Sequence, residues 1–234
     1  MAKLAVDGGK PVRTKPFPEW PIFGELEERM IVDAVRAGKW GGAGRVKPGY
    51  TDYIAELERK FAELQDAKFA LCCVNGTLAI AVALQAAGVE AGDEVIVPPY
   101  TFIATVSAPL LFGAVPVFCD IDANTMMIDP DKVEPLITPR TKAIIAVHIA
   151  GAPANMTRLK EIAAKHNLVL VEDAAQAVGA KWDGVGVGAI GDIGTFSLQA
   201  SKNVNSGEGG VVVTNREDLK DAAWSVINVG RTPA

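Results

Sequence analysis

One lysine, Lys202, lies in a polar, glycine-rich segment that stands between two apolar runs of the chain. Residues 193–198 form the first run and residues 211–213 the second, so the segment between them is predicted as a turn that joins two buried strands. A lysine that is partly shielded from water loses its proton more readily and becomes a nucleophile for carbonyl carbons. Because most lysines in turns are solvated charges, the rest of the chain must decide between these two interpretations.

Two further polar segments follow predicted strands and could take part in the same chemistry. Gly76 and Thr77 open a predicted helix directly after a strand, where free backbone N–H groups bind phosphate. Asp173 ends another strand, and Gln176 follows it by one helical turn. A carboxylate at that place can pair with a buried, positively charged ring nitrogen. Considered one at a time, each segment also fits an ordinary helix cap.

A phosphate site, a carboxylate and a lysine are together the groups that an enzyme using pyridoxal 5'-phosphate (PLP) needs. The phosphate is held at the helix start, the pyridinium nitrogen stays protonated against the carboxylate, and the aldehyde binds the lysine as a Schiff base. The combination of the three segments is far more specific than any one of them. It favours a reactive role for Lys202 over that of a solvated surface charge.

Three other motifs are interpreted as structural. Gly186-Val187-Gly188-Ala189-Ile190-Gly191 has the spacing of a dinucleotide-binding loop, but a strand-like run follows it where such a loop requires a helix. His148 ends an apolar strand and is interpreted as a hydrogen-bonded structural histidine rather than a base. Cys72, Cys73 and Cys119 lack metal-ligand spacing, so no metal site is predicted and the thiols are assigned to the core.

The composition limits the classes of partner. A net charge of −5 gives no electrostatic footprint for nucleic acid or for an anionic membrane surface. Three cysteines fit reduced thiols in a cytoplasmic protein, and the N-terminus lacks the apolar region of a secretory signal. The charge-free stretches 69–89 and 95–119 are long enough to span a bilayer, but an Asn-Gly-Thr turn interrupts the first and prolines the second. Both are therefore interpreted as buried elements joined by turns.

From residue 68 onward the chain alternates apolar strands with amphipathic helices. This rhythm predicts an α/β fold, in which helices on both faces flank a mostly parallel sheet whose ligands bind beyond the carboxyl ends of the strands. Residues 1–23, rich in proline and glycine, are predicted as an extended arm, and residues 24–234 as one large domain. The predicted strands are 69–74, 94–97, 115–120, 143–147, 169–172, 193–198 and 211–213. The predicted helices are 25–37, 53–65, 77–87, 102–112, 130–137, 157–166 and 218–227.

These motifs, in this order, are similar to those of a known family. The chain resembles the DegT/DnrJ/EryC1/StrS family, PLP-dependent aminotransferases of the aspartate aminotransferase fold (fold type I) that act on sugars and cyclitols. The resemblance extends from about residue 20 to the end of the chain. The segments that carry it are 75–77, 92–98, 101–105, 172–176 and 197–210.

The resemblance implies a role for each site residue. Lys202 would form the Schiff base with the cofactor aldehyde, and Asp173 would pair with the pyridine nitrogen. Gln176 would lie near the ring oxygen, and Phe102 would stack on the ring. The resemblance assigns the cofactor phosphate to two groups of ligands: Gly76, Thr77 and Ser197 from this chain, and Asn228 reaching the cofactor of the partner subunit.

The resemblance also implies substrates and an assembly. It indicates transamination of a keto-sugar or keto-cyclitol with L-glutamate or L-glutamine as amino donor, in a homodimer whose active site lies at the interface. Segments 19–21 and 39–41 are similar to the branch that acts on cyclitol ketones such as scyllo-inosose and 2-deoxy-scyllo-inosose. Family members continue into a small C-terminal domain, which we expect to be absent from this chain.

Two alternatives stay open from the sequence. One is a PLP-dependent sugar dehydratase of the same fold, in which the lysine is commonly replaced by histidine, so Lys202 argues against it. The other is a truncated, non-catalytic paralogue that keeps the large domain for cofactor binding or regulation. The expected absence of the C-terminal domain favours this second alternative, and the complete set of cofactor-binding residues opposes it.

Overall fold

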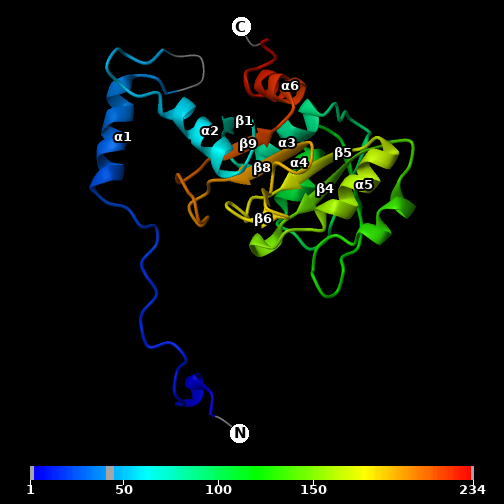
Figure 1. Ribbon diagram of the computed structural model, residues 1–234, viewed down its shortest axis with the longest axis horizontal. Coiled ribbons are helices and arrows are strands. Elements are labelled where there is room, and N and C mark those ends of the chain that lie inside the picture. The colour runs from blue at the N-terminus through cyan, green and yellow to red at the C-terminus, as the bar shows by residue number, and fades with distance from the viewer. Residues whose placement is uncertain (1–2, 41–44, 233–234) are drawn as a thin grey trace.

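The computed structural model describes residues 3–40 and 45–232, and a seven-stranded sheet lies at its centre (Figure 1). The strand order is β1-β9-β8-β5-β4-β2-β3. Strand β9 runs antiparallel to both of its neighbours, whereas the other neighbouring pairs are parallel, which confirms the predicted mostly parallel sheet. The strands are β1 (Phe69–Cys73), β2 (Glu94–Val97), β3 (Val115–Phe118), β4 (Thr141–Val147), β5 (Val169–Asp173), β8 (Ile193–Ser197) and β9 (Gly210–Thr214).

Helices cover both faces of this sheet. Helices α3 (Gly76–Ala86), α4 (Ala104–Leu110) and α6 (Glu217–Ile227) share one hydrophobic core, and α5 (Met156–His166) and α2 (Tyr53–Leu64) pack on the other face. Strand β2 is apolar after Glu94 because both of its faces are covered. Val95 and Val97 belong to the first core and Ile96 to the core under α5, because successive side chains point to opposite faces of a sheet.

Two predicted helices differ from the structure. The segment predicted as one helix over 130–137 forms two short 3-10 helices, η2 (Pro130–Lys132) and η3 (Glu134–Leu136). Pro135 lies inside the segment, lacks an N–H group and clashes with the preceding turn, so a regular α-helix cannot pass through it. Helix α4 begins at Ala104 rather than at Phe102, which places the Phe102 ring in the turn before the helix.

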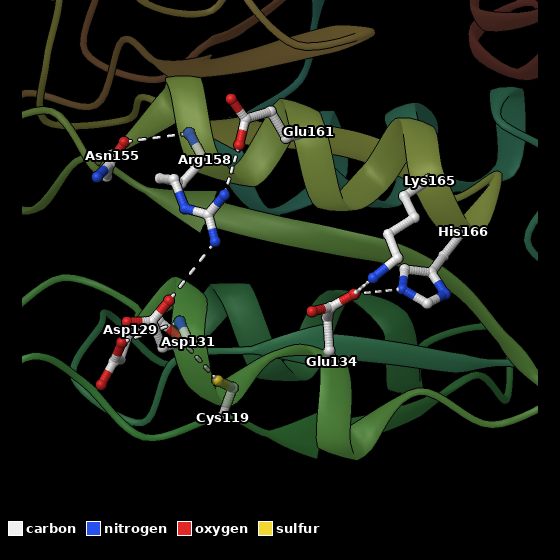
Figure 2. Close-up of polar contacts among 9 residues, drawn as sticks. All are labelled: Cys119, Asp129, Asp131, Glu134, Asn155, Arg158, Glu161, Lys165 and His166. Atoms are coloured by element: carbon white, nitrogen blue, oxygen red, sulfur yellow. Dashed lines mark hydrogen bonds and ion pairs between the residues drawn. The ribbon is translucent and has the colours of Figure 1, made fainter.

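Ion pairs attach the segment of η2 and η3 to α5 (Figure 2). Oε1 of Glu134 lies 2.6 Å from Nζ of Lys165 and 2.7 Å from Nε2 of His166. Asp131 lies 3.7 Å from Arg158 on the first turn of the same helix. Pairs at the surface contribute little energy each, so the buried side chains of α5, among them Leu159, supply most of the packing here.

The two charge-free stretches are parts of the sheet and its helices. Residues 69–89 contain β1 and α3, and residues 95–119 contain α4 and β3 together with most of β2. In the described part of the chain, no helix combines the length and the apolar character that crossing a bilayer requires. A short hairpin of β6 (Lys181–Trp182) and β7 (Val185–Gly186), which the sequence did not predict, completes the strands.

The N-terminal arm runs away from the sheet (dark blue in Figure 1). Apart from the 3-10 helix η1 (Ala5–Asp7), residues 3–24 contain no regular element, and most of them are exposed. Helix α1 (Glu25–Ala37) follows, and Ala37 is its one buried residue. The helix therefore presents apolar side chains to solvent along much of its length: Leu26, Met30, Ile31, Val32 and Val35.

Candidate active site

A cavity of about 530 Å³ opens at the carboxyl ends of the parallel strands. It collects seven of the eight predicted site residues on its wall, from four separate segments of the chain. The residues are Gly76, Thr77, Phe102, Asp173, Gln176, Ser197 and Lys202. The topology explains this convergence, because parallel strands bring their carboxyl ends to the same edge of a sheet.

Asp173 is the last residue of β5 and contributes a buried carboxylate to the cavity wall. Thr105 donates its hydroxyl to Oδ2 at 2.6 Å, and the backbone N–H of Ala175 donates to Oδ1 at 3.2 Å. Burial raises the pKa of this carboxyl above its ordinary value, because two hydrogen bonds replace only part of the lost hydration. A cation placed against Asp173 would favour the ionised form.

The start of α3 fits a phosphate group. Asn75 caps the helix by accepting from the N–H of Leu78 at 2.9 Å, which leaves the N–H groups of Gly76 and Thr77 free of intrahelical partners. A Cβ added to Gly76 would lie 2.8 Å from Cβ of Ser197, so only glycine allows the two segments to meet. Backbone donors and a serine hydroxyl thereby share a space that any larger side chain at position 76 would fill.

Lys202 lies in the turn between β8 and β9, and its half-buried side chain reaches the cavity. Backbone hydrogen bonds fix the turn at both ends. Ala200 N–H donates to the carbonyl of Gly207 at 2.8 Å, and Ser206 N–H donates to that of Leu198 at 2.9 Å. The N–H of Lys202 itself donates to the carbonyl of Gln199 at 2.8 Å. Among the described residues, Lys202 has no ion-pair partner, so its amine is available to a ligand.

Two predicted residues occupy the margin of the site or lie outside it. Gln176 is exposed, and its Oε1 accepts from the N–H of Ala150 at 2.7 Å, which orients the amide at the cavity edge. Asn228 caps the end of α6 instead, where its Nδ2 donates to the carbonyl of Trp224 at 2.9 Å. Asn228 was expected to reach the cofactor of a partner subunit, and that role stays a prediction.

The similarity of this chain to known proteins agrees with the chemistry that the cavity residues suggest. Residues 27–234 match the model of the family described as the DegT/DnrJ/EryC1/StrS aminotransferase family. The chain belongs to this family.

Individual relatives of this aminotransferase family cover most of the chain. The chain is 45% identical over 213 residues to the L-glutamine:2-deoxy-scyllo-inosose aminotransferase of Streptomyces kanamyceticus, covering 91% of this chain and 50% of that protein. An aminotransferase structure from Psychrobacter cryohalolentis is 41% identical with a TM-score of 0.85, over 93% of this chain and 54% of that chain.

A further solved structure carries a bound cofactor. NtdA from Bacillus subtilis, solved with the cofactor PMP, is 32% identical with a TM-score of 0.76, over 86% of this chain and 44% of that chain. The chain thus spans about half the length of the relatives it matches.

Beside the cavity lies a buried anion site that the sequence did not reveal. The carboxylate of Glu172 accepts from the N–H groups of Gly188, Ile190 and Gly191 at 2.7, 2.8 and 2.6 Å. The segment with dinucleotide-binding spacing therefore binds a carboxylate of its own chain, which agrees with its rejection as a nucleotide site. His148 also contacts this group, with Nε2 2.9 Å from Oε2 of Glu172.

The hydrogen bonds of His148 fix its tautomer. Nδ1 accepts from the backbone N–H of Ala154 at 3.1 Å, so the proton is on Nε2 and is donated to Glu172. The ring is completely buried. His148 is thus a hydrogen-bonded structural histidine, as predicted, and it links the ends of β4 and β5 beside the cavity.

The cysteines also match their predicted place in the structure. Burial raises the pKa of the Cys72 thiol to about 12, that of Cys73 to about 11 and that of Cys119 to about 12. Thiols with such values carry almost no thiolate at neutral pH and are poor nucleophiles. They fill space in the fold.

Sequence reasoning missed Thr105, the hydroxyl donor to Asp173. Thr105 stands in the segment 101–105 that carried the family resemblance, but its partner is 68 residues away in the chain. A second hydroxyl, that of Thr101, lies 2.6 Å from Oγ1 of Thr105. Because the single proton of Thr105 goes to Asp173, Thr101 must donate to Thr105. Gln199, Ser201 and Glu208, also missed, add polar groups to the cavity wall.

Proposed function

We propose that this chain forms the cofactor-binding part of a PLP-dependent aminotransferase that converts a keto-cyclitol to an amino-cyclitol. The observation that carries the proposal is the cavity into which Lys202, the buried Asp173 and the start of α3 all face. The relative from Streptomyces kanamyceticus, named for L-glutamine and 2-deoxy-scyllo-inosose, supports L-glutamine as amino donor and a cyclitol ketone as acceptor.

The residues of the cavity fit PLP in charge and in shape. The N–H groups of Gly76 and Thr77 and the hydroxyl of Ser197 would hold the phosphate, and the carboxylate of Asp173 would hold the protonated ring nitrogen. Lys202 would bind the aldehyde carbon through Nζ. The proposal also assigns Phe102 to the ring face and Gln176 to the ring oxygen. When bound, PLP supplies an electron sink for the carbanion that forms next to the transferred nitrogen.

The chain's own residues account for the proton movements of an amino transfer. Asp173, ionised against a cation and fixed by the Thr101–Thr105 hydroxyl chain, keeps the proton on the ring nitrogen. Nζ of Lys202, once free, would take a proton from the carbon that carries the amino group and return it to the carbon on the other side of the transferred nitrogen. Water would then release the donor as its keto acid, and the ketone oxygen of the acceptor would leave as water when the nitrogen passes to that carbon. Both half-reactions need the same lysine in the same place.

A homodimer is part of the proposal. Exposed apolar side chains along α1 and in the arm, such as Met30, Ile31 and Phe23, offer a surface that a second copy of the chain would cover. The family resemblance supports an active site at such an interface, where Asn228 of one subunit would be directed at the cofactor of the other. Because the chain spans about half of its relatives, activity and assembly are proposed for the whole protein.

The decisive experiment measures whether PLP attaches to Lys202. Added PLP should give the absorbance of a lysine-bound cofactor, and reduction with borohydride followed by peptide mapping should place the label on Lys202. Lys202→Ala should abolish both signals. Lys181→Ala, which removes an exposed lysine paired with Asp66 outside the cavity, should leave them unchanged. Labelling that survives Lys202→Ala would contradict the assignment.

Product analysis separates the remaining alternatives. With L-glutamine and 2-deoxy-scyllo-inosose, an aminotransferase yields the amino-cyclitol and the keto acid in equal amounts. A dehydratase would release water from a keto-sugar without consuming the donor. A non-catalytic paralogue would bind PLP at Lys202 and give neither product.

A further inference from the structure

One hydrogen bond joins the described part of the N-terminal arm to the Lys202 turn. Nε1 of Trp20 donates to the carbonyl oxygen of Ala200 at 2.7 Å, across 180 residues of sequence. The other side-chain hydrogen bonds of the described arm, those of Arg13, stay within the arm. The indole is half exposed, and the hydrogen bond gives its contact with the turn a defined direction. The bond thus fixes which backbone group of the turn the arm meets.

The carbonyl oxygen of Ala200, which accepts this bond, lies close enough in the chain to influence the position of Lys202. The carbonyl of Ala200 is two residues before the lysine, and among the described residues no other group donates to it. The peptide that carries this carbonyl runs into Ser201, whose N–H and hydroxyl both donate to Oε1 of Gln199, at 2.8 and 2.7 Å. The Trp20 indole thus closes a short network that spans the residues immediately before Lys202.

We propose that Trp20 is a positioning residue that holds the Lys202 turn through its indole N–H. Apart from the Trp20 bond, the exposed turn depends on local bonds, such as that between the N–H of Lys202 and the carbonyl of Gln199, and on one bond after the lysine, in which Nδ2 of Asn203 donates to the carbonyl of Val178 at 3.1 Å. Fixing the carbonyl of Ala200 from outside limits rotation of the following peptides and so limits the positions open to Nζ of Lys202. The arm thereby acts on the cavity without lining it. Only the cofactor readouts below rest on the proposed function.

The direct test is hydrogen–deuterium exchange of the cofactor-free protein. Trp20→Phe keeps an aromatic ring and removes the N–H donor. The peptide covering 199–209 should then exchange about three to ten times faster, the range expected for the loss of one hydrogen bond. Trp40→Phe is the matched control, because the Trp40 indole donates to the carbonyl of Val35 in the preceding helix, α1, and is more exposed. This control should leave the turn unchanged.

Two cofactor readouts follow from the same contact. Bound PLP should dissociate about three to ten times faster from the Trp20→Phe protein. The pH midpoint of the cofactor absorbance should also shift, which a purely structural effect elsewhere in the arm would not cause. If exchange in the turn is unchanged by Trp20→Phe, or rises equally with Trp40→Phe, the proposal is wrong. Exchange decides this even if PLP binds none of the proteins, an outcome that would count against the proposed function alone.

Discussion

Replacing Asp173 by asparagine should stabilise the cofactor-free protein while weakening its hold on PLP. The substitution removes a buried negative charge and keeps the shape of the side chain. An asparagine Oδ1 still accepts from the N–H of Ala175, and its Nδ2 can donate to the hydroxyl of Thr105. Thr105 then donates to Thr101, which reverses the direction of the hydroxyl chain without leaving a polar group unpaired.

The expected gain in stability follows from the balance between the cost of burying the Asp173 carboxylate and the hydrogen bonds that it accepts. Burying an ionised carboxylate costs several kcal/mol, and each hydrogen bond to a charged group returns about 1.5–3 kcal/mol. With two such bonds, from Thr105 and Ala175, a net cost of roughly 1–3 kcal/mol remains for the ionised form. Asp173→Asn should raise the free energy of unfolding by that amount at neutral pH.

The effect should depend on pH in a definite direction. Burial raises the pKa of Asp173 in the folded state, so the unfolded chain gives up this proton first as the pH rises. Below about pH 4, the ordinary value of an aspartate, both states are protonated and the variant gains nothing. The gain should then grow as the pH rises toward the folded-state pKa and stay constant above it.

Urea denaturation of the cofactor-free proteins between pH 4.5 and 8 measures this gain. Asp131→Asn, at an aspartate whose side chain is 84% exposed, serves as the control and should change stability by less than about 0.5 kcal/mol. In the same series, PLP should bind Asp173→Asn at least about tenfold more weakly, because a charged hydrogen bond to the ring nitrogen is lost. Equal or lower stability of Asp173→Asn at pH 8 would refute the idea that the cavity carries an uncompensated charge.

Three further substitutions or reactions test other parts of the site. Gly76→Ala should cost about 1–3 kcal/mol in urea denaturation and weaken PLP binding, because its Cβ would meet Ser197, and adding Ser197→Gly should recover part of the stability. Glu172→Gln should lower the free energy of unfolding by about 2–5 kcal/mol, since it removes an acceptor oxygen from a buried carboxylate with four donors. A loss of stability no larger than that of the surface variant Glu161→Gln would contradict the anion site. Alkylation of Cys119 by iodoacetamide at pH 8 should be at least about 100-fold slower in the folded than in the unfolded protein, because burial raises the pKa of the thiol to about 12. Mass spectrometry measures both rates, and comparable rates would show that the thiol is accessible.

Much of the sheet could be predicted because its strands are apolar on both faces. Strand β2 matches its prediction, since charged or turn-forming residues bound a short valine- and isoleucine-rich run. The site was predictable for a related reason: once the strands are known to be parallel, residues at their carboxyl ends must converge. The family resemblance then assigned a role to each of them.

The parts that could not be predicted depend on contacts between distant residues. Nothing in the sequence near Thr105 shows that Asp173 will be its partner, and nothing near Gly188 shows that Glu172 will bind its N–H group. The start of α4 was placed too early because apolar residues continue through Phe102, although the regular helical bonds begin after it. The two 3-10 helices in 130–136 were predicted as one α-helix because Val133, Leu136 and Ile137 have helical spacing, which Pro135 interrupts.

The reversed direction of β9 makes the Lys202 turn a separable unit of the fold. Ser197 and Gly210 face each other as paired residues of β8 and β9, so the sheet fixes both ends of the segment between them. The length and sequence of this segment can therefore change without altering the register of the strands on either side. A segment from another family member could be exchanged here as a cassette bounded by Ser197 and Gly210. Such an exchange would carry the lysine and its polar neighbours together while leaving Asp173 and the start of α3 in place.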